Sequence, residues 1–249
     1  MSTLICFALK EEAAPFRKIA AGKSGISILL TGIGRENAKK SVHEFLTGGA
    51  SVPASHSGDD SPDQGRLASA LAAPGLVLTC GFAGGLNPDL KLGDVIFELP
   101  DRRHELPKSP SDAKIRDSQS SSLRDSLAAA GATPAKFFCA NRIATTIAEK
   151  KKLRDETGAD AVEMESATLH AVCRERGIPC VTVRVISDTA NEDLPLDFNA
   201  LAKPDKNLDY GKLFLAIAKS PGKIGELMQL QKNTKFAAGR LAEVLAKVI

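Results

Sequence analysis

The acidic residues Glu163 and Glu165 stand one residue apart in the run AVEMESATLHAV, which is otherwise small or apolar. Removing a carboxylate from water costs roughly several kcal/mol unless a partner compensates, so acids in such a run indicate either a site or a buried ion pair. Paired carboxylates can bind a cation, hold sugar hydroxyls, or act as acid and base on a glycosyl bond. The run is therefore a candidate for chemistry.

The geometry of this acidic pair depends on where its strand ends. In a chain extended to Glu165, the two glutamates share one strand face and Met164 points to the other. In a chain that turns into the helix at Glu165, that carboxylate lies near a helix N-terminus. Asp188 ends the next apolar run in the same way. The alternative to a site is that Glu163 or Asp188 pairs with Arg184 or caps a helix.

Two glycine-rich turns and a second acidic pair also follow apolar runs. Glu11 and Glu12 come directly after the first run. The turn TGIGRENA opens a helix at Gly34, which suits a phosphate or a ribose, yet it lacks a dinucleotide fingerprint and a P-loop lysine, so a plain tight turn is the alternative. The run GFAGGL, residues 81–86, lets a flat ligand lie against the main chain; a bulge without ligand is its alternative.

Apolar runs of strand length alternate with helical patterns along the chain. The expected strands are residues 3–9, 25–32, 75–81, 94–99, 135–140, 159–165 and 179–187. The expected helices are residues 11–20, 35–47, 121–130, 145–155, 166–176 and 207–218. This alternation predicts an α/β fold with a largely parallel sheet covered on both faces, whose strand carboxyl ends carry the site.

We expect one domain over residues 1–249, interrupted by two irregular segments. Residues 48–74 are rich in Gly, Ser, Pro and Asp and predict a surface insertion. Residues 100–119 are charged and contain proline, as in functional lids and binding loops. The tail, residues 222–249, has helical periodicity and wraps the domain or packs on a partner chain.

Composition argues against a nucleic-acid-binding protein, a metal-binding protein and a membrane protein. The 249 residues are 43% hydrophobic and carry a net charge of +3 spread along the chain, which gives no nucleic-acid footprint. Five cysteines without a C-x-x-C pair are typical of buried thiols in a reducing compartment, and we expect no metal site. The first apolar run is far shorter than the ~20 residues of a membrane span, and no basic segment precedes it. We expect a soluble, cytoplasmic protein.

Taken together, these motifs resemble the superfamily of purine nucleoside phosphorylases and methylthioadenosine/adenosylhomocysteine nucleosidases. The resemblance extends over roughly residues 3–192 and is carried by FALKEEAAPF, TGIGRENA, GFAGGLNPDLKLGDVI, ADAVEMES and VRVISDTAN, in the family's order and spacing. It implies a mixed, largely parallel sheet that forms a distorted barrel flanked by helices. It also implies a homo-oligomer, a dimer or larger, whose neighbouring chain often completes the pocket.

The resemblance assigns roles that suit cleavage of a purine N-ribosidic bond. Asp188 would protonate or hydrogen-bond the purine N7, and Glu165 would accept hydrogen bonds from the ribose, with Met164 beneath the sugar. Glu12 matches the glutamate that activates water in the hydrolytic branch. Main-chain groups near Arg142 and Ile143 would meet the base. The resemblance also implies a substrate site that includes Phe82, Ala83, Gly84, Ile143 and Ser187, with Glu163 in a supporting or peripheral place. The turn at Gly34 and Arg35 is a candidate phosphate site on its own residues.

Two departures from the family pattern leave the nucleophile open. Phe82 stands where these enzymes usually have a serine or similar hydroxyl, and CANRIA replaces a polar Ser-Gly-Asp run. Both features resemble the hopanoid-associated phosphorylase-like branch, whose substrate is thought to be an adenosyl-lipid. If phosphate is the nucleophile, Lys10, Arg35 or the pair Arg102 and Arg103 would supply its positive charge. His104 and His170 are read as solvated or packed residues.

Three functions therefore stay open. The first is hydrolysis of an adenine nucleoside of the methylthioadenosine type, and the second is phosphorolysis of a purine nucleoside or adenosyl-lipid. The third is binding of a nucleoside without turnover. None of them needs a cofactor, although inorganic phosphate would be the co-substrate of the second.

Overall fold

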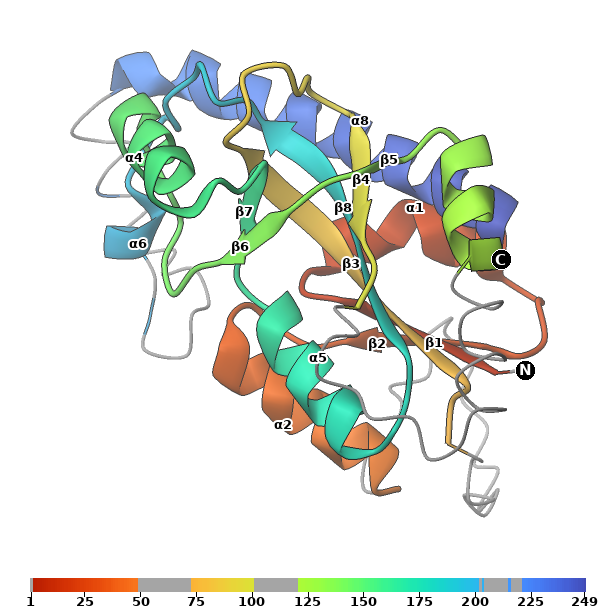
Figure 1. The fold of residues 1–249 in the computed structure, drawn as a ribbon. Coiled ribbons are helices and arrows are strands. Elements are labelled where there is room, and N and C mark those ends of the chain that lie inside the picture. The colour runs from red at the N-terminus through yellow and green to blue at the C-terminus, as the bar shows by residue number, and fades with distance from the viewer. Residues whose placement is uncertain (1, 49–72, 101–120, 202, 204–214, 216–220) are drawn as a thin grey trace.

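Eight strands of the described chain form one mixed sheet with helices on both faces (Figure 1). The computed structural model describes residues 2–48, 73–100, 121–201, 203, 215 and 221–249. The hydrogen-bonded order is β2-β1-β3-β8-β4-β5, with β7 also beside β3 and β6 beside β7. The β3–β7 and β4–β8 pairs are antiparallel, whereas the other five pairs are parallel. The predicted mixed, largely parallel sheet flanked by helices is confirmed.

All seven expected strands are present, together with one short strand that the sequence did not reveal. The strands are β1 Thr3–Phe7, β2 Ile26–Leu30, β3 Leu76–Gly85, β4 Val95–Glu98, β5 Thr133–Pro134, β6 Phe137–Cys139, β7 Ala161–Glu163 and β8 Cys180–Asp188. The helices are α1 Lys10–Ala20, α2 Arg35–Leu46, a helix at residues 121–129, α4 Ile147–Thr157, α5 Ser166–Glu175, α6 Phe198–Leu201, the 3-10 turn η2 Pro221–Lys223 and α8 Ile224–Val248. The expected helix at 207–218, and most of the segments 48–74 and 100–119, lie outside the described residues.

Two strands end at other points than the sequence predicted. β7 stops at Glu163 because the carboxylate of Glu163 accepts the N–H groups of Glu165 and Ser166, at 2.9 and 2.8 Å, and turns the chain into α5. β3 continues to Gly85 because its far end pairs with β7 on one edge and β8 on the other. Glu163 and Glu165 therefore do not share a strand face.

The two faces of the sheet pack against different helices. Leu78, Val181 and Val183 face α1 and α8 and form the larger apolar core with residues such as Phe16 and Leu241. The long α8 runs along this side beside α1, while α2 and α5 lie together on the opposite side (Figure 1). The helix expected in the C-terminal tail is thus present as α8, and it packs on α1 and β8. No described helix is long and apolar enough to cross a membrane.

The residues of β8 that face α5 change from apolar to polar along the strand. Near its start, Cys180 belongs to the apolar cluster beneath α2 and α5. Further along, Thr182 contacts His170 of α5 and Arg184 contacts Glu163, and the strand ends at Asp188. All nine residues of β8 are buried. The sheet therefore has a buried polar region at the carboxyl ends of β3 and β8, where ligands of α/β folds commonly bind.

Candidate active site

A buried arginine organises the polar region. Arg184 is 1% exposed, and its Nη2 donates to Glu163 Oε2 at 2.8 Å and to Thr79 Oγ1 at 3.1 Å. The same nitrogen lies 3.5 Å from Glu165 Oε2. We call Thr79, Glu163, Glu165 and Arg184 the arginine cluster. The pairing of Glu163 with Arg184 is the structural alternative that the sequence had left open.

Glu163 is fully engaged by the protein. In addition to Arg184 and the two main-chain N–H groups, its carboxylate accepts the Ser166 hydroxyl at 2.6 Å. Burial raises the pKa of Glu163, but Arg184 and these hydrogen bonds outweigh burial and leave the pKa below its ordinary value. Glu163 is an ionised support for Arg184 and for the start of α5.

Glu165 connects three segments that are distant in sequence. It is the residue before the first turn of α5, and its Oε1 accepts the N–H of Gly34, 131 residues away, at 2.8 Å. Gly34 precedes α2 with a φ of 87°, a conformation that favours glycine. Burial raises the pKa of Glu165 despite the nearby Arg184. The carboxylate is thus fixed at the meeting point of α2, α5 and β8.

Glu12 is the third buried acid of this region, and it contacts β3. It reaches back to the N–H of Leu9 at 2.9 Å, which supports the first turn of α1, and it accepts the N–H of Phe82 at 2.9 Å. Gly81 has a φ of +150°, and a Cβ there would lie 2.8 Å from Glu12 Oε1. Burial raises the pKa of Glu12 to about 7. Its neighbour Glu11 is exposed.

The acids of this region outnumber its cations. Glu12, Glu163 and Glu165 all interact with Arg184, which is the one guanidinium that their pKa shifts share. Burial raises the pKa values of Glu12 and Glu165, and the nearby Arg184 offsets this only in part. A site with surplus buried carboxylate favours a ligand or transition state that carries positive charge.

Asp188 is held by a lysine and not by Arg184. Its Oδ2 lies 2.7 Å from Lys150 Nζ, and its Oδ1 accepts the Ser187 hydroxyl at 2.7 Å. A Cβ at Gly84 would lie 3.1 Å from Asp188 Oδ2. The glycines of GFAGGL therefore make room for acids, Gly81 for Glu12 and Gly84 for Asp188, where the sequence had suggested room for a flat ligand.

A family model described as "Phosphorylase superfamily" matches residues 9–206, which is most of the chain. The chain belongs to the phosphorylase superfamily. It is 29% identical over 148 residues to the 5'-methylthioadenosine/S-adenosylhomocysteine nucleosidase of Shewanella halifaxensis, covering 51% of this chain and 62% of that protein. The nucleosidase of the same name from Shewanella oneidensis is 27% identical over 165 residues, covering 55% and 68%. The match thus spans less than two thirds of the length of the first relative and slightly more than two thirds of the second.

Solved structures share the fold of this superfamily member at full length. The 5'-methylthioadenosine/S-adenosyl homocysteine nucleosidase of Campylobacter jejuni has a TM-score of 0.59 at 18% identity, covering 100% of this chain and 98% of that one. The futalosine hydrolase of Helicobacter pylori has a TM-score of 0.62 at 17% identity, covering 100% and 97%. The family resemblance and the fold inferred from sequence motifs are confirmed.

Several residues expected around the substrate of a phosphorylase-superfamily site contact the protein instead. The N–H of Ile143 donates to Asn199 Oδ1 and its carbonyl accepts from Asn199 Nδ2, both at 2.9 Å. The Phe82 side chain packs on the core beneath α1 and α8, and only its N–H reaches Glu12. Ala83 packs with Ile96 in a small apolar cluster.

The candidate phosphate site is also occupied by protein groups. The N–H of Gly34 is taken by Glu165, and Arg35 Nη2 donates to the carbonyl of Cys139. Lys10 is exposed at the start of α1, while Arg102 and Arg103 lie outside the described residues. The structure thus brings Glu12 and Glu165 together around Arg184, and it places Asp188 beside Gly84 near the ends of β3 and β8. At the candidate phosphate site, the Gly34 N–H and one Arg35 nitrogen already donate to protein groups, while the buried Arg35 Nε has no hydrogen-bond partner among the described residues.

The remaining predicted residues have simpler surroundings. Met164 is half-buried in the turn between β7 and α5. His170 packs against Thr182 with Nε2 2.9 Å from Oγ1, and burial lowers the pKa of His170 to about 4, so it is a packed, neutral residue. His104 lies outside the described residues. All five cysteines are free thiols, and only Cys139 is incompletely buried.

Sequence reasoning missed Lys150 and Thr79. Lys150 is the first of three consecutive lysines in α4, and a run of this kind reads as a solvated helix face. Its position three residues before Leu153, which packs on an apolar cluster, is a weak signal of its burial. Thr79 carries no signal, because threonine is common in strands for reasons of propensity alone.

Proposed function

We propose that this chain hydrolyses the N-ribosidic bond of a purine nucleoside and releases the free base. The proposal rests above all on Glu12, a buried acid whose pKa is raised to about 7, beside a region with more carboxylates than cations. An adenine nucleoside of the methylthioadenosine type is the best candidate substrate, because two curated relatives carry the name of such a nucleosidase.

The chemistry of the reaction suits these residues. As the C1'–N9 bond breaks, its electron pair goes to the base and the sugar acquires oxocarbenium character. Asp188, entering the step in its protonated form, would donate its proton to N7 of the departing purine, and Glu165 would accept hydrogen bonds from the ribose hydroxyls. Glu12 would take one proton from a water molecule as its oxygen bonds to C1'. The products are the protonated, neutral base and the free sugar.

Water is favoured over phosphate by the surroundings of the proposed site. A phosphate dianion next to Glu12 and Glu165 would meet surplus negative charge. The N–H of Gly34, which could have held it, donates to Glu165 instead. A general base with a pKa near 7 is suited to water, which must lose a proton, and phosphate needs no such base.

The test is release of free base by the purified protein from methylthioadenosine, adenosylhomocysteine, adenosine and inosine, each with and without phosphate. Release without phosphate is expected, and Asp188→Asn is expected to abolish it without loss of the folded circular dichroism spectrum. Strict dependence on phosphate would replace hydrolysis by phosphorolysis, and an adenosyl-lipid would then be the next substrate to assay. Binding without release would leave a nucleoside-binding protein.

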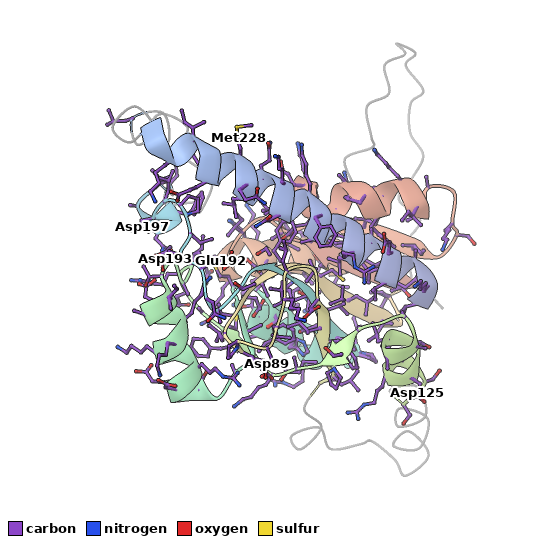
Figure 2. The ribbon with its side chains drawn as sticks, turned by 90° about the horizontal axis from the view of Figure 1, so that it is seen from above. Asp89, Asp125, Glu192, Asp193, Asp197 and Met228 are labelled. Atoms are coloured by element: carbon purple, nitrogen blue, oxygen red, sulfur yellow. The ribbon has the colours of Figure 1, made fainter. Side chains whose placement is uncertain are left out.

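We also propose that the protein acts as a homo-oligomer in the cytoplasm. The resemblance to the phosphorylase superfamily supports this, and α8 offers exposed apolar side chains for a contact, with Met228 56% and Phe236 53% exposed. Met228 projects from α8 in Figure 2. Sedimentation of the purified protein is expected to give a dimer or larger species, and a monomer at assay concentration would contradict this part of the proposal.

A further inference from the structure

Lys150 is a buried cation with a full set of acceptors. Its side chain is 0% exposed in α4, and Nζ lies 2.7 Å from Asp188 Oδ2, 2.7 Å from the carbonyl of Thr189 and 2.9 Å from the carbonyl of Glu192. An ammonium has three N–H donors, and here each has an acceptor. We call Lys150 and Asp188 the lysine pair.

The two lysines that follow in the same helix behave differently. Lys151 and Lys152 have side chains that are 73% and 74% exposed, and they pair with Asp155 and Glu156 one turn later. Such exposed pairs contribute little to stability. The buried position of Lys150 is therefore not a general property of this lysine run, and the exposed neighbour provides a chemically identical control.

Asp188 is fixed from both sides yet remains partly open. Lys150 contacts Oδ2 and the Ser187 hydroxyl donates to Oδ1, so rotation of the carboxylate would break one or both contacts. Each carboxylate oxygen offers about two lone-pair sites, so one of them can still carry the proton that Asp188 would donate to N7 of the base. The Asp188 side chain is 11% exposed, whereas that of Lys150 is fully covered. A ligand can thus reach the acid but not the lysine.

Lys150 also holds the turn that follows Asp188. Within this turn the N–H of Thr189 donates to Glu192 Oε1 at 2.7 Å. The turn is joined to the start of α4 by a bond from the N–H of Ile147 to Asp193 Oδ1, at 2.6 Å. Figure 2 shows Glu192 and Asp193 close together beside α4. The ammonium therefore fixes both the acid and the main chain next to it.

We propose that Lys150 is a positioning residue for Asp188, which holds the carboxylate in the orientation that the purine base requires. The inference rests on the proposed function, since it assigns Asp188 to the base. Lys150 acts through Asp188 and does not touch the substrate. Its removal should therefore affect turnover and base binding only while residue 188 is an aspartate.

The experiment compares Lys150→Met with Lys151→Met in two measurements. In base release from the best nucleoside substrate, Lys150→Met is expected to lower kcat at least ~10-fold with a smaller change in KM, and Lys151→Met is expected to match the wild type. In calorimetric binding of adenine, Lys150→Met is expected to weaken the affinity in the wild-type background but to have no effect beyond ~2-fold in an Asp188→Asn background. Binding remains measurable when turnover is lost.

The outcomes separate this inference from the proposed function. Wild-type kcat in a folded Lys150→Met protein, or an equal loss of adenine affinity in both backgrounds, would overturn the positioning role and leave hydrolysis standing. Absence of base release by the wild type, with the coupling in adenine binding intact, would overturn hydrolysis alone. If Lys150→Met does not fold, Lys150→Gln, which keeps a donor, replaces it. Failure of both variants to fold would make Lys150 part of the fold and overturn the proposal.

Discussion

The arginine cluster and the lysine pair both bury acids next to a cation, but they differ in the ratio of acids to cations. In the cluster, one guanidinium meets Glu163 and Glu165 and also influences Glu12, so negative charge is in excess. In the lysine pair, one ammonium meets one carboxylate, and main-chain carbonyls take its other two donors. Burial with too little neighbouring positive charge leaves Glu12 and Glu165 with raised pKa values, which suits a general base, while a balanced pair fixes a group in place.

The largest effect is expected when the general base Glu12 is replaced. Glu12→Gln is expected to lower kcat/KM for base release by roughly 10²–10⁴-fold, because an amide cannot take a proton from water. Glu11→Gln is the matched control, since Glu11 is adjacent but exposed, and it is expected to match the wild type. Wild-type kcat/KM is expected to rise with pH through about 7, as Glu12 ionises. An Glu12→Gln enzyme with unchanged kcat/KM would remove Glu12 from the mechanism.

The stability of the two regions should differ when each loses its cation. Arg184→Met is expected to lower the free energy of unfolding by roughly 3–5 kcal/mol, because it leaves Glu163 buried and uncompensated. Lys150→Met is expected to cost less, because Asp188 has an 11% exposed side chain that water can reach, whereas that of Glu163 is 0% exposed. Urea unfolding of both variants measures the difference, and an equal or larger loss in Lys150→Met would contradict it.

His170, which packs against β8 beside the arginine cluster, makes the stability of the protein depend on pH. Burial lowers the pKa of His170 to about 4, from its ordinary value of 6.5, so the folded state resists a proton that the unfolded chain accepts. Its contribution to stability is present above pH 6.5 and is lost as pH falls toward 4, by up to roughly 2 kcal/mol at pH 5.

The measurement is urea unfolding of the wild type and of His170→Gln at pH 7 and pH 5. The wild type is expected to lose more unfolding free energy between these values than the variant. Glu12 acts in the opposite direction, since its raised pKa costs stability as pH rises from 4.5 to about 7, but it is present in both proteins and cancels. His43→Gln is the control, because His43 is exposed. If His170→Gln lost as much unfolding free energy between pH 7 and pH 5 as the wild type does, His170 would not be the group that causes the loss.

The smallest effect is expected at the edge of the arginine cluster. Thr79→Val keeps the shape of the side chain but removes the acceptor that lies 3.1 Å from Arg184 Nη2. Since that nitrogen still donates to Glu163, the loss in unfolding free energy should be about 1 kcal/mol. A loss as large as that of Arg184→Met would show that Thr79 is essential to the cluster.

Much of the fold and part of the site could be read from the sequence. Hydrophobic period and turn residues are local properties, so the seven longer strands and most helices were predictable, and β5, with two residues, was not. The ends of β3 and β7 were misplaced because pairing partners and side-chain bonds set them, as when Glu163 turns the chain at Glu165. The contact between Asn199 and the main chain of Ile143 could not be predicted, because no local signal links residues that are 56 positions apart.

The sequence by itself determined that acids and glycines follow successive apolar strands, which limits the site to one edge of an α/β sheet. Only the tertiary structure decided which cation meets which acid. Arg184 could have paired with either Glu163 or Asp188, and any of three lysines in α4 could have been the buried one. These choices depend on contacts such as that between Gly34 and Glu165, 131 residues apart, and on burial, which strengthens a charge pair and penalises an unpaired charge.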